Sequence, residues 1–302
     1  MLSALLNIDC SLNGSRAQGE KLLSDLSTWR IGGPCKYFVQ VSDHHQLASS
    51  LRHCNEQSMR YIVIGKGSNC LFDDLGFDGC VIRNSIVFLE RNEPGLYRAG
   101  SGYPFNRLGL QTANEGFSGL EFAAAIPGTV GGATYMNAGA NGQETADAVE
   151  SVEIMTREGE CVIFKRSELG FGYRWSSFQD MKELAAITAV TFTLKVSESE
   201  KKNQQEYMER RRCSQPLEET SAGSVFRNPE GTDLCAAQLI ERAGLKGCRV
   251  GGAVISEKHA NFFINRGGAT SGDMLRLIDL AKEAVWRQFG VELHEEVLYI
   301  PP

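Results

Sequence analysis

One glycine-rich run, residues 126–142, constrains this chain more than any other stretch. It reads IPGTVGGATYMNAGANG and contains five glycines, one proline and no charged residue. A flexible linker is normally polar, so this apolar run is expected inside the protein. Its buried backbone then needs hydrogen-bond partners, and successive N–H groups in a glycine turn can form a nest for an anion. A tightly packed core turn and an anion-binding nest explain the run equally well on its own.

A second glycine loop, GKGSNCL at residues 65–71, follows the apolar segment YIVI. The dinucleotide fingerprint of Rossmann proteins opens a helix, but residues 72–79 here have the composition of turns. In isolation, this loop is better explained as a hairpin turn. Two glycine loops together, however, favour a buried cofactor that carries phosphate, held by loop N–H groups and by Ser68 and Asn69.

Composition excludes several other classes of protein. The chain has 302 residues, of which 42% are hydrophobic, and this is enough for two or three domains. Its net charge is −6 and no basic stripe carries interleaved aromatics, so we expect no nucleic-acid partner. No apolar run is long enough to span a bilayer, and the N-terminus lacks the pattern of a secretory signal. We therefore expect no membrane association.

Cysteine and histidine are scattered along the chain. Nine cysteines occur without a CxxC pair, and the five histidines are also dispersed. This pattern gives no support for a zinc or iron–sulfur site, and it predicts reduced, structural thiols.

Elements of both types alternate along the chain and predict an α+β class. Residues 1–27 are expected to be loosely structured, and residues 184–196 to form one long strand. The charged segment 197–212 is the best candidate for a domain boundary. In the loop FGYRWSSF, residues 171–178, aromatic residues surround Arg174. This arginine either stacks on a ring at the surface or is aimed at an anionic ligand.

Nine motifs occur in order over residues 28–300: TWRIGGP, VIGKGSN, GLEFAAAIPGTVGGA, MNAGA, GYR, SAGSVFRNP, AGLKG, SEKHANF and EEVLYI. Together they resemble the UDP-N-acetylenolpyruvoylglucosamine reductase family. The resemblance implies the FAD-binding fold of the vanillyl-alcohol-oxidase (PCMH) type. Its two subdomains are expected at residues 1–84 and 85–200, and an α+β substrate-binding domain at residues 201–302. Only 46 residues separate Arg174 from Ser221, which implies the shorter, second type without an extra substrate-covering loop.

The resemblance also implies a reaction. NADPH passes a hydride to N5 of FAD and then to the vinyl carbon of UDP-N-acetyl-3-O-(1-carboxyvinyl)glucosamine, which gives UDP-N-acetylmuramate for peptidoglycan precursors. The partners would be this UDP-sugar and NADPH, and the protein would be a monomer in the cytoplasm, or in the plastid stroma of a plant. Two alternatives are another FAD-dependent oxidoreductase of the same fold and a flavin-binding protein without catalysis. The motifs AGS, GYR and EEV disfavour both.

Three residues match the catalytic positions of the family: Arg174, Ser224 and Glu296. The forked donors of Arg174 suit a carboxylate. Ser224 matches the proton donor to the substrate carbon. Glu296, if burial keeps it partly protonated, can donate to the carboxylate of the intermediate or assist through Arg174.

The resemblance assigns the remaining site residues to two groups. For FAD, it implies Gly65, Lys66, Gly67, Ser68, Asn69, Cys70, Leu71, Ile126, Pro127, Gly128, Thr129, Gly132, Ala133, Asn137, Gly139 and Arg212. For the substrate, it implies Tyr173, Arg227, Asn228 and His259. Two positions depart from the family pattern: Arg227 replaces a usual lysine, and Asn141 replaces a frequent aromatic. The first change keeps the charge but alters its geometry.

Overall fold

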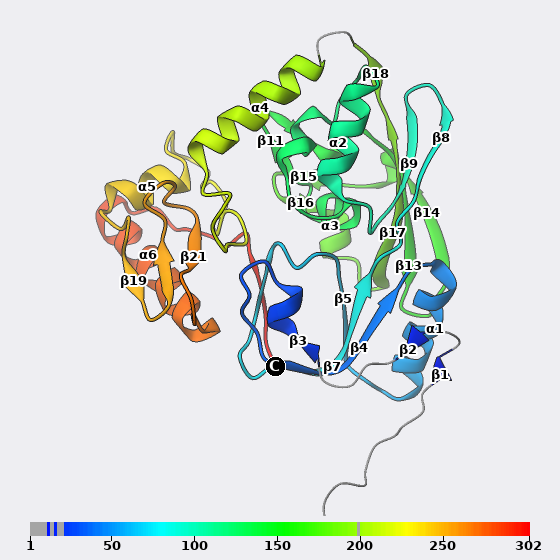
Figure 1. Ribbon diagram of the computed structural model, residues 1–302, viewed down its shortest axis with the longest axis horizontal. Helices are drawn as coiled ribbons and strands as arrows, with labels where there is room; N and C mark the ends of the chain where they lie inside the picture. The colour runs from blue at the N-terminus through cyan, green and yellow to red at the C-terminus, as the bar shows by residue number, and fades with distance from the viewer. Residues whose placement is uncertain (1–10, 13–14, 17–20, 198–199) are drawn as a thin grey trace, which may run out of the picture.

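A computed structural model of the chain describes residues 11–12, 15–16, 21–197 and 200–302. Two lobes are visible in Figure 1, with the C-terminal domain on one side and the sheets of the first two hundred residues on the other. Most of the N-terminal segment expected to be loosely structured lies outside the described residues. Residues 21–27 contradict that expectation, because they form strand β3 (Lys21–Leu22) and a 3₁₀ helix that buries Leu23 and Leu26.

The first sheet is built mainly from parallel strands. Its order is β3, β4 (Pro34–Val41), β7 (Phe77–Asn84) and β5 (Tyr61–Ile64), and β7 runs parallel to both β4 and β5. Helix α1 (His44–Glu56) connects β4 to β5 and buries Leu47, Leu51 and Cys54 against the sheet. The C-terminal end of β5 therefore leads directly into the first glycine loop.

The second sheet is antiparallel and has five strands. Its order is β14 (Cys161–Lys165), β13 (Val149–Thr156), β17 (Leu184–Thr193), β9 (Leu96–Gly100) and β8 (Leu89–Glu93). The single strand expected over 184–196 is interrupted at Leu194, whose side chain turns into the core. Strand β18 (Lys195–Val196) then pairs with β10 (Phe117–Ser118) instead. Helix α2 (Phe105–Asn114) buries Leu108 and Ala113 in the core of this subdomain.

The C-terminal domain packs two helices against a small antiparallel sheet. The sheet consists of β19 (Arg249–Val250), β20 (Ala253–Ile255) and β21 (Phe263–Asn265). The helices are α5 (Ala236–Arg242) and α6 (Ser271–Phe289). A capping box with Thr270 begins α6, and left-handed Gly290 (φ +66°) ends it. The buried residues of α6 recur at the helical spacing that the sequence predicts.

Segments far apart in the sequence join the two lobes. Trp29, Ile31 and Leu71 belong to the hydrophobic core of the C-terminal domain. The C-terminal strand β22 (Leu298–Ile300) returns to pair in parallel with β6 (Cys70–Phe72), directly after the first glycine loop. Helix α4 (Glu200–Ser214) connects the lobes along one side (Figure 1). The domain boundaries at residues 84 and 200 stay a prediction, because some residues before position 84 belong to the core of the C-terminal domain.

Short two-stranded pairings complete the structure. They are β1 (Ser11–Leu12) with β2 (Ser15–Arg16), β11 (Gly139–Ala140) with β12 (Gln143–Glu144), and β15 (Phe171–Gly172) with β16 (Trp175–Ser176). All eight cysteines in the described part of the chain are free thiols. No helix among the described residues is both long enough and apolar enough to cross a membrane.

Candidate functional site

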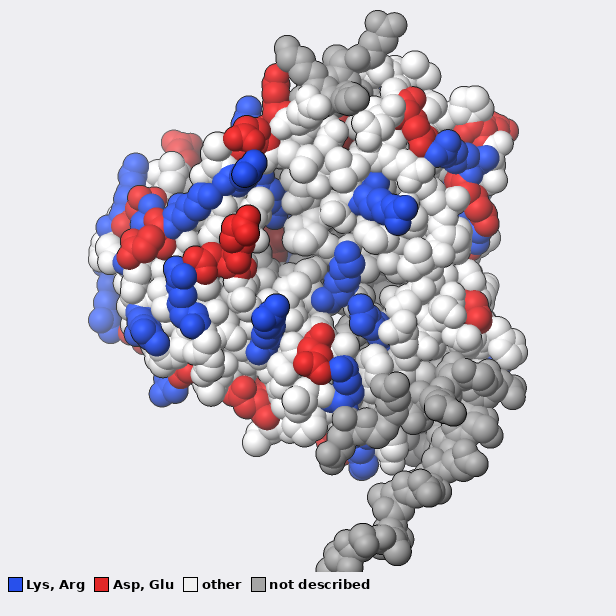
Figure 2. Space-filling view, in the orientation of Figure 1, with Lys and Arg blue, Asp and Glu red and all other residues white. Residues whose placement is uncertain are grey.

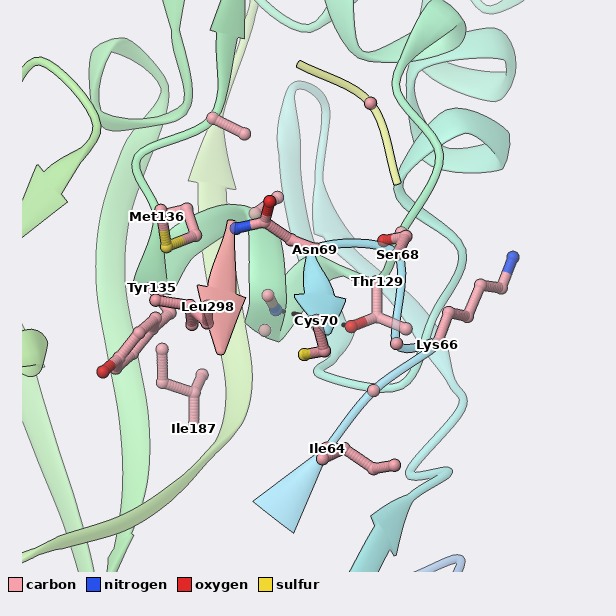
Figure 3. A pocket seen from close by; sticks show the side chains of 18 of the residues that line it. Ile64, Lys66, Ser68, Asn69, Cys70, Thr129, Tyr135, Met136, Ile187 and Leu298 are labelled. Atoms are coloured by element: carbon pink, nitrogen blue, oxygen red, sulfur yellow. Dashed lines mark hydrogen bonds between the residues drawn. The ribbon is translucent and has the colours of Figure 1, made fainter. Parts of the chain in front are cut away.

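A cavity of about 730 Å³ lies where the two glycine loops meet the C-terminal domain. Residues of the first subdomain, the second sheet, the end of α4 and the C-terminal segment all contribute to its lining. Figure 3 shows Ser68, Asn69, Cys70 and Thr129 grouped at this cavity, whereas the side chain of Lys66 extends away from them. The cavity is therefore an interface between lobes, and no single local motif forms it.

The first glycine loop needs its glycines for two separate steric reasons. Gly67 has a left-handed backbone (φ +61°), and a Cβ there would lie 1.9 Å from the carbonyl oxygen of Leu26. Gly65 faces the second loop, where a Cβ would lie 2.5 Å from Oγ1 of Thr129. The side chain of Ser68 donates a hydrogen bond to the carbonyl of Pro127 at 3.4 Å. The two loops thus pack directly against each other.

The second glycine run contains a helix that its composition did not indicate. Helix α3 (Val130–Tyr135) begins after Thr129, whose hydroxyl accepts a hydrogen bond from the N–H of Gly132 at 3.3 Å. Gly131 packs against Ser101, where a Cβ would come within 2.9 Å of the serine side chain. Most of the run is buried or half-buried, but Pro127 and Gly132 within it and Asn141 and Gly142 at its end are exposed.

Polar groups without partners show that the cavity suits a polar cofactor. Among the described residues, the backbone N–H groups of residues 66–69 have no protein acceptor. Arg211 Nε and Gln215 Oε1 line the same cavity, and within the described part of the chain they are buried without a hydrogen bond. Burial lowers the pKa of Arg211 to about 10, so its guanidinium stays cationic at neutral pH. Adjacent loop N–H groups and a buried cation fit the phosphates and polar edges of FAD.

Arg174 and Glu296 form an ion pair across the lobe interface. Arg174 Nε lies 2.8 Å from Glu296 Oε1, and each side chain is 18% exposed. Arg174 also donates from Nη2 to the carbonyl of Gly139 at 3.1 Å, and its guanidinium lies 4.9 Å from the ring centroid of Tyr173. The arginine therefore stacks on a ring and also lines the cavity, and its role towards an anionic ligand stays a prediction.

Burial is the main influence on the ionisation of Glu296. It raises the pKa of this carboxyl above its ordinary value, and the nearby charges of Arg174 and Arg227 oppose the rise. The adjacent Glu295 faces a different environment, because it pairs with Lys282 at 2.9 Å. The two neighbouring glutamates thus face different surroundings, because Glu296 lines the cavity and Glu295 pairs with a lysine outside it.

A short extended segment places Ser224 next to Glu296. Val225 donates to the carbonyl of Asn261 at 2.9 Å, and its own carbonyl accepts from the N–H of Glu296 at 2.7 Å. Ser224 forms an isolated bridge with Phe262, and the Ser224 and Glu296 side chains line the same cavity as Arg174. The structure therefore brings together three residues that are up to 122 positions apart in the sequence, from Arg174 to Glu296.

Most of the residues assigned to FAD line the cavity, but three do not. Arg212 is exposed, and its neighbour Arg211 lines the cavity instead. Consecutive helical residues point about 100° apart, so the run RRR could not be resolved without the phase of α4. Leu71 is fully buried in the core of the C-terminal domain. Asn137 is also fully buried, and its amide donates to Glu144 and to the carbonyl of Gly172, both at 2.8 Å.

The residues assigned to the substrate lie outside the cavity lining. Tyr173 accepts a hydrogen bond at its hydroxyl from the N–H of Asn228 at 3.2 Å, which connects the two lobes beside the Arg174–Glu296 pair. Arg227 Nε is buried without a hydrogen bond in the described part of the chain, as is Nδ1 of His259. Burial lowers the pKa of His259, with further lowering by Lys246 and Arg211. This histidine is therefore neutral near pH 7.

Sequence reasoning missed many residues of the cavity, among them the polar residues Tyr61, Gln179, Arg211 and Gln215. Gln215 stands immediately before Pro216, and Arg211 one turn earlier, so a helix ending at the proline could have placed both on one face. Tyr61 and Gln179 carry no comparable signal in the sequence.

The chain is similar to known proteins over most of its length. Residues 35–165 match a family model described as an FAD binding domain, and residues 215–300 match the C-terminal domain of UDP-N-acetylenolpyruvoylglucosamine reductase. The chain is 49% identical to the reductase of that name from Protochlamydia amoebophila, over 93% of this chain and 92% of the relative. It is 44% identical to the corresponding reductase from Chlamydia felis, over 92% and 93% of the two chains.

A solved structure gives the same result. The UDP-N-acetylenolpyruvylglucosamine reductase from Thermus caldophilus superposes with a TM-score of 0.77 at 35% identity, covering 95% of this chain and 100% of that one. The expected α+β fold with an FAD-binding domain is confirmed. The chain belongs to the UDP-N-acetylenolpyruvoylglucosamine reductase family, whose members are FAD-dependent oxidoreductases of peptidoglycan precursor synthesis.

Proposed function

We propose that this chain uses NADPH and FAD to reduce UDP-N-acetyl-3-O-(1-carboxyvinyl)glucosamine to UDP-N-acetylmuramate. The observation that carries the proposal is the Arg174–Glu296 ion pair, which lines one cavity together with Ser224 and both glycine loops. A cation, a carboxyl of raised pKa and a hydroxyl are the groups that an enol ether bearing a carboxylate requires.

The two glycine loops would hold FAD, which supplies the hydride-transfer chemistry when bound. The free N–H groups of residues 66–69 would receive its phosphates. Arg211 and Gln215 would contact its polar groups at the end of α4, and we assign Arg211 this part in place of Arg212.

Arg174 would stabilise the negative charge that develops during reduction. Hydride addition to the terminal vinyl carbon leaves negative charge on the neighbouring carbon and on its carboxylate. The guanidinium of Arg174 can bind that carboxylate through two parallel donors. Glu296 faces Arg174, and its raised pKa lets the protonated form donate a hydrogen bond to the same carboxylate.

Ser224 would deliver the proton to the neighbouring carbon. A serine hydroxyl is a weak acid in water, so it can act only when it is held next to a strongly basic carbon. Two strand-like contacts fix the segment that carries Ser224, one with residues 261–262 and one with residues 294–296. This rigid placement supports the assignment.

Anionic substrates would meet basic side chains at the lobe interface. Figure 2 shows Lys and Arg side chains in the middle of this face, where the lobes meet, with an acidic side chain among them. Such a group raises the local concentration of polyanions such as NADPH and a UDP-sugar. Tyr173, Arg227, Asn228 and His259 lie around this interface, and we propose that they contact the UDP-sugar.

The first test is the visible absorption of the purified protein without oxygen. Addition of NADPH should bleach a flavin band, and the enolpyruvyl UDP-sugar should then restore it. NADH in place of NADPH tests the choice of nucleotide. A band that bleaches but does not return with this substrate would contradict the proposed reaction and leave the FAD-binding fold intact.

Ser224→Ala should separate the two half-reactions. We expect flavin reduction by NADPH to stay within about twofold of wild type, and reoxidation by substrate to slow by at least about a hundredfold, because general acid catalysis contributes that much. Stopped-flow absorbance measures both rates. Ser221→Ala is the matched control, since Ser221 does not line the cavity. Equal slowing of both half-reactions in Ser224→Ala would exclude the proton-donor role.

A further inference from the structure

The hairpin that carries Arg174 is strained at the arginine itself. Strands β15 and β16 pair through Phe171 with Ser176 and through Gly172 with Trp175, so Tyr173 and Arg174 form a two-residue turn. Arg174 has a left-handed backbone (φ +55°), a conformation that residues with a side chain adopt rarely. Such a conformation persists only where the surrounding structure holds it.

Gln179 supplies a restraint at this point. Its Nε2 donates to the carbonyl of Arg174 at 3.2 Å and to the carbonyl of Tyr135 at 2.9 Å. A side-chain amide has two N–H donors, so both are used. Tyr135 is the last residue of α3, and its carbonyl also accepts from Ser176 Oγ at 2.6 Å. Gln179 therefore connects the strained arginine to the end of the helix in the glycine run.

Two further hydrogen bonds join the same segments. Asn137 Nδ2 donates to the carbonyl of Gly172 at 2.8 Å, and Arg174 Nη2 donates to the carbonyl of Gly139 at 3.1 Å. Among these contacts, Gln179 alone acts on the backbone of Arg174. It also lines the cavity, whereas Asn137 is fully buried outside it.

We propose that Gln179 is a positioning residue: it holds Arg174 in its left-handed conformation and thereby directs the guanidinium towards Glu296. This inference rests on the proposed role of Arg174. Without the Gln179 donor, the peptide after Arg174 relaxes and the guanidinium moves away from Glu296. Arg174 and Arg227 are the cations that act on Glu296, and the neighbouring Glu295 is neutralised by Lys282 at 2.9 Å. Displacement of Arg174 therefore raises the pKa of Glu296.

Gln179→Met tests the inference, because methionine keeps the size of the side chain and removes both donors. We expect kcat to fall by about tenfold, the effect of one lost hydrogen bond. Activity should fall at high pH as Glu296 loses its proton. We also expect this fall in kcat to occur at a higher pH in the variant. Flavin content, measured from absorbance after release from the protein, should match wild type.

Ser176→Ala is the control for a purely structural effect. It removes the other donor to the Tyr135 carbonyl and leaves the Arg174 backbone untouched, so it should lower thermal stability without moving the pH limb. If Gln179→Met retains less than half of the wild-type flavin, Gln179→Leu decides instead, since it loses the donors without adding a charge to the cavity. If the deciding variant has the kcat of wild type, and its kcat falls at the same pH as that of wild type, the inference is overturned.

Arg174→Lys, measured in parallel, separates this inference from the proposed function. Wild-type kcat in Arg174→Lys would contradict the role of the arginine itself. Loss of activity in Arg174→Lys, together with wild-type behaviour of the Gln179 variant, would contradict only the positioning role of Gln179.

Discussion

At the scale of single residues, opposing influences on Glu296 decide its chemistry. Burial favours the neutral carboxylic acid, and the guanidinium groups of Arg174 and Arg227 favour the carboxylate. Because burial dominates, the pKa is raised, and the protonated acid survives to higher pH than for an ordinary glutamate. Activity that requires this acid should fall as pH rises through the raised pKa. The departure at Arg227 keeps one of the two opposing charges in place.

Arg227→Gln should move this fall in activity to higher pH. Removal of one cation raises the pKa of Glu296 further, so the protonated form persists over a wider range. The measurement is kcat against pH at saturating UDP-sugar. Lys282→Gln is the control, because Lys282 pairs with Glu295 and does not contribute to the pKa shift of Glu296. A limb that stays at the wild-type pH in Arg227→Gln would show that this arginine is too distant to act.

At the scale of elements, the two glycine loops become one structure only by mutual packing. Each was ambiguous in the sequence, because a hairpin turn could explain the first loop and a tightly packed core turn could explain the second. In the structure, Gly65 packs against Thr129 and Gly67 against Leu26, so that added side-chain atoms would clash at both positions. Loop glycines of this kind are required by neighbours that lie 41 and 64 positions away in the sequence.

Gly67→Ala should impair both folding and flavin binding. Its Cβ would lie 1.9 Å from the carbonyl oxygen of Leu26, so the loop must shift, and we expect FAD affinity to fall by at least about tenfold. Gly142→Ala is a matched control: its backbone is also left-handed (φ +79°), but nothing lies within 4 Å of the added Cβ. That control should cost only about 1 kcal/mol of stability. Flavin fluorescence titration and thermal unfolding distinguish the two variants, and equal FAD affinity in both would contradict the steric account.

At the scale of the whole molecule, the N-terminal and C-terminal segments bind the two lobes together. Trp29 is fully buried in the C-terminal core, and its indole N–H donates to the carbonyl of Phe263 at 2.7 Å. Asn265 in turn donates to the carbonyl of Trp29 at 2.9 Å. The pairing of β22 with β6 adds a second connection. Buried contacts therefore connect the two walls of the cavity between the lobes.

Trp29→Phe should destabilise the folded protein by about 1–3 kcal/mol, because it leaves the buried carbonyl of Phe263 without its donor and removes packed ring atoms. Denaturant unfolding followed by circular dichroism measures the loss. Trp286→Phe is the matched control, since Trp286 is 59% exposed on α6. If the two variants unfolded at the same denaturant concentration, the proposed connection between the lobes would carry no stability.

The sequence by itself determined the fold class, the FAD-binding family and the apolar face of α6. These follow from local spacing and from motifs whose order along the chain is specific. It also identified Arg174, Ser224 and Glu296 as candidates, which the structure places on one cavity. Their chemical roles stay predictions.

Only the tertiary structure decided which arginine of the run 210–212 lines the cavity, where Asn137 places its amide, and that Trp29 belongs to the C-terminal core. Each of these depends on helix phase or on a partner distant in sequence. The free energy that selects them comes from tertiary contacts, both within a lobe and between the lobes, and a local pattern of residues does not specify those contacts.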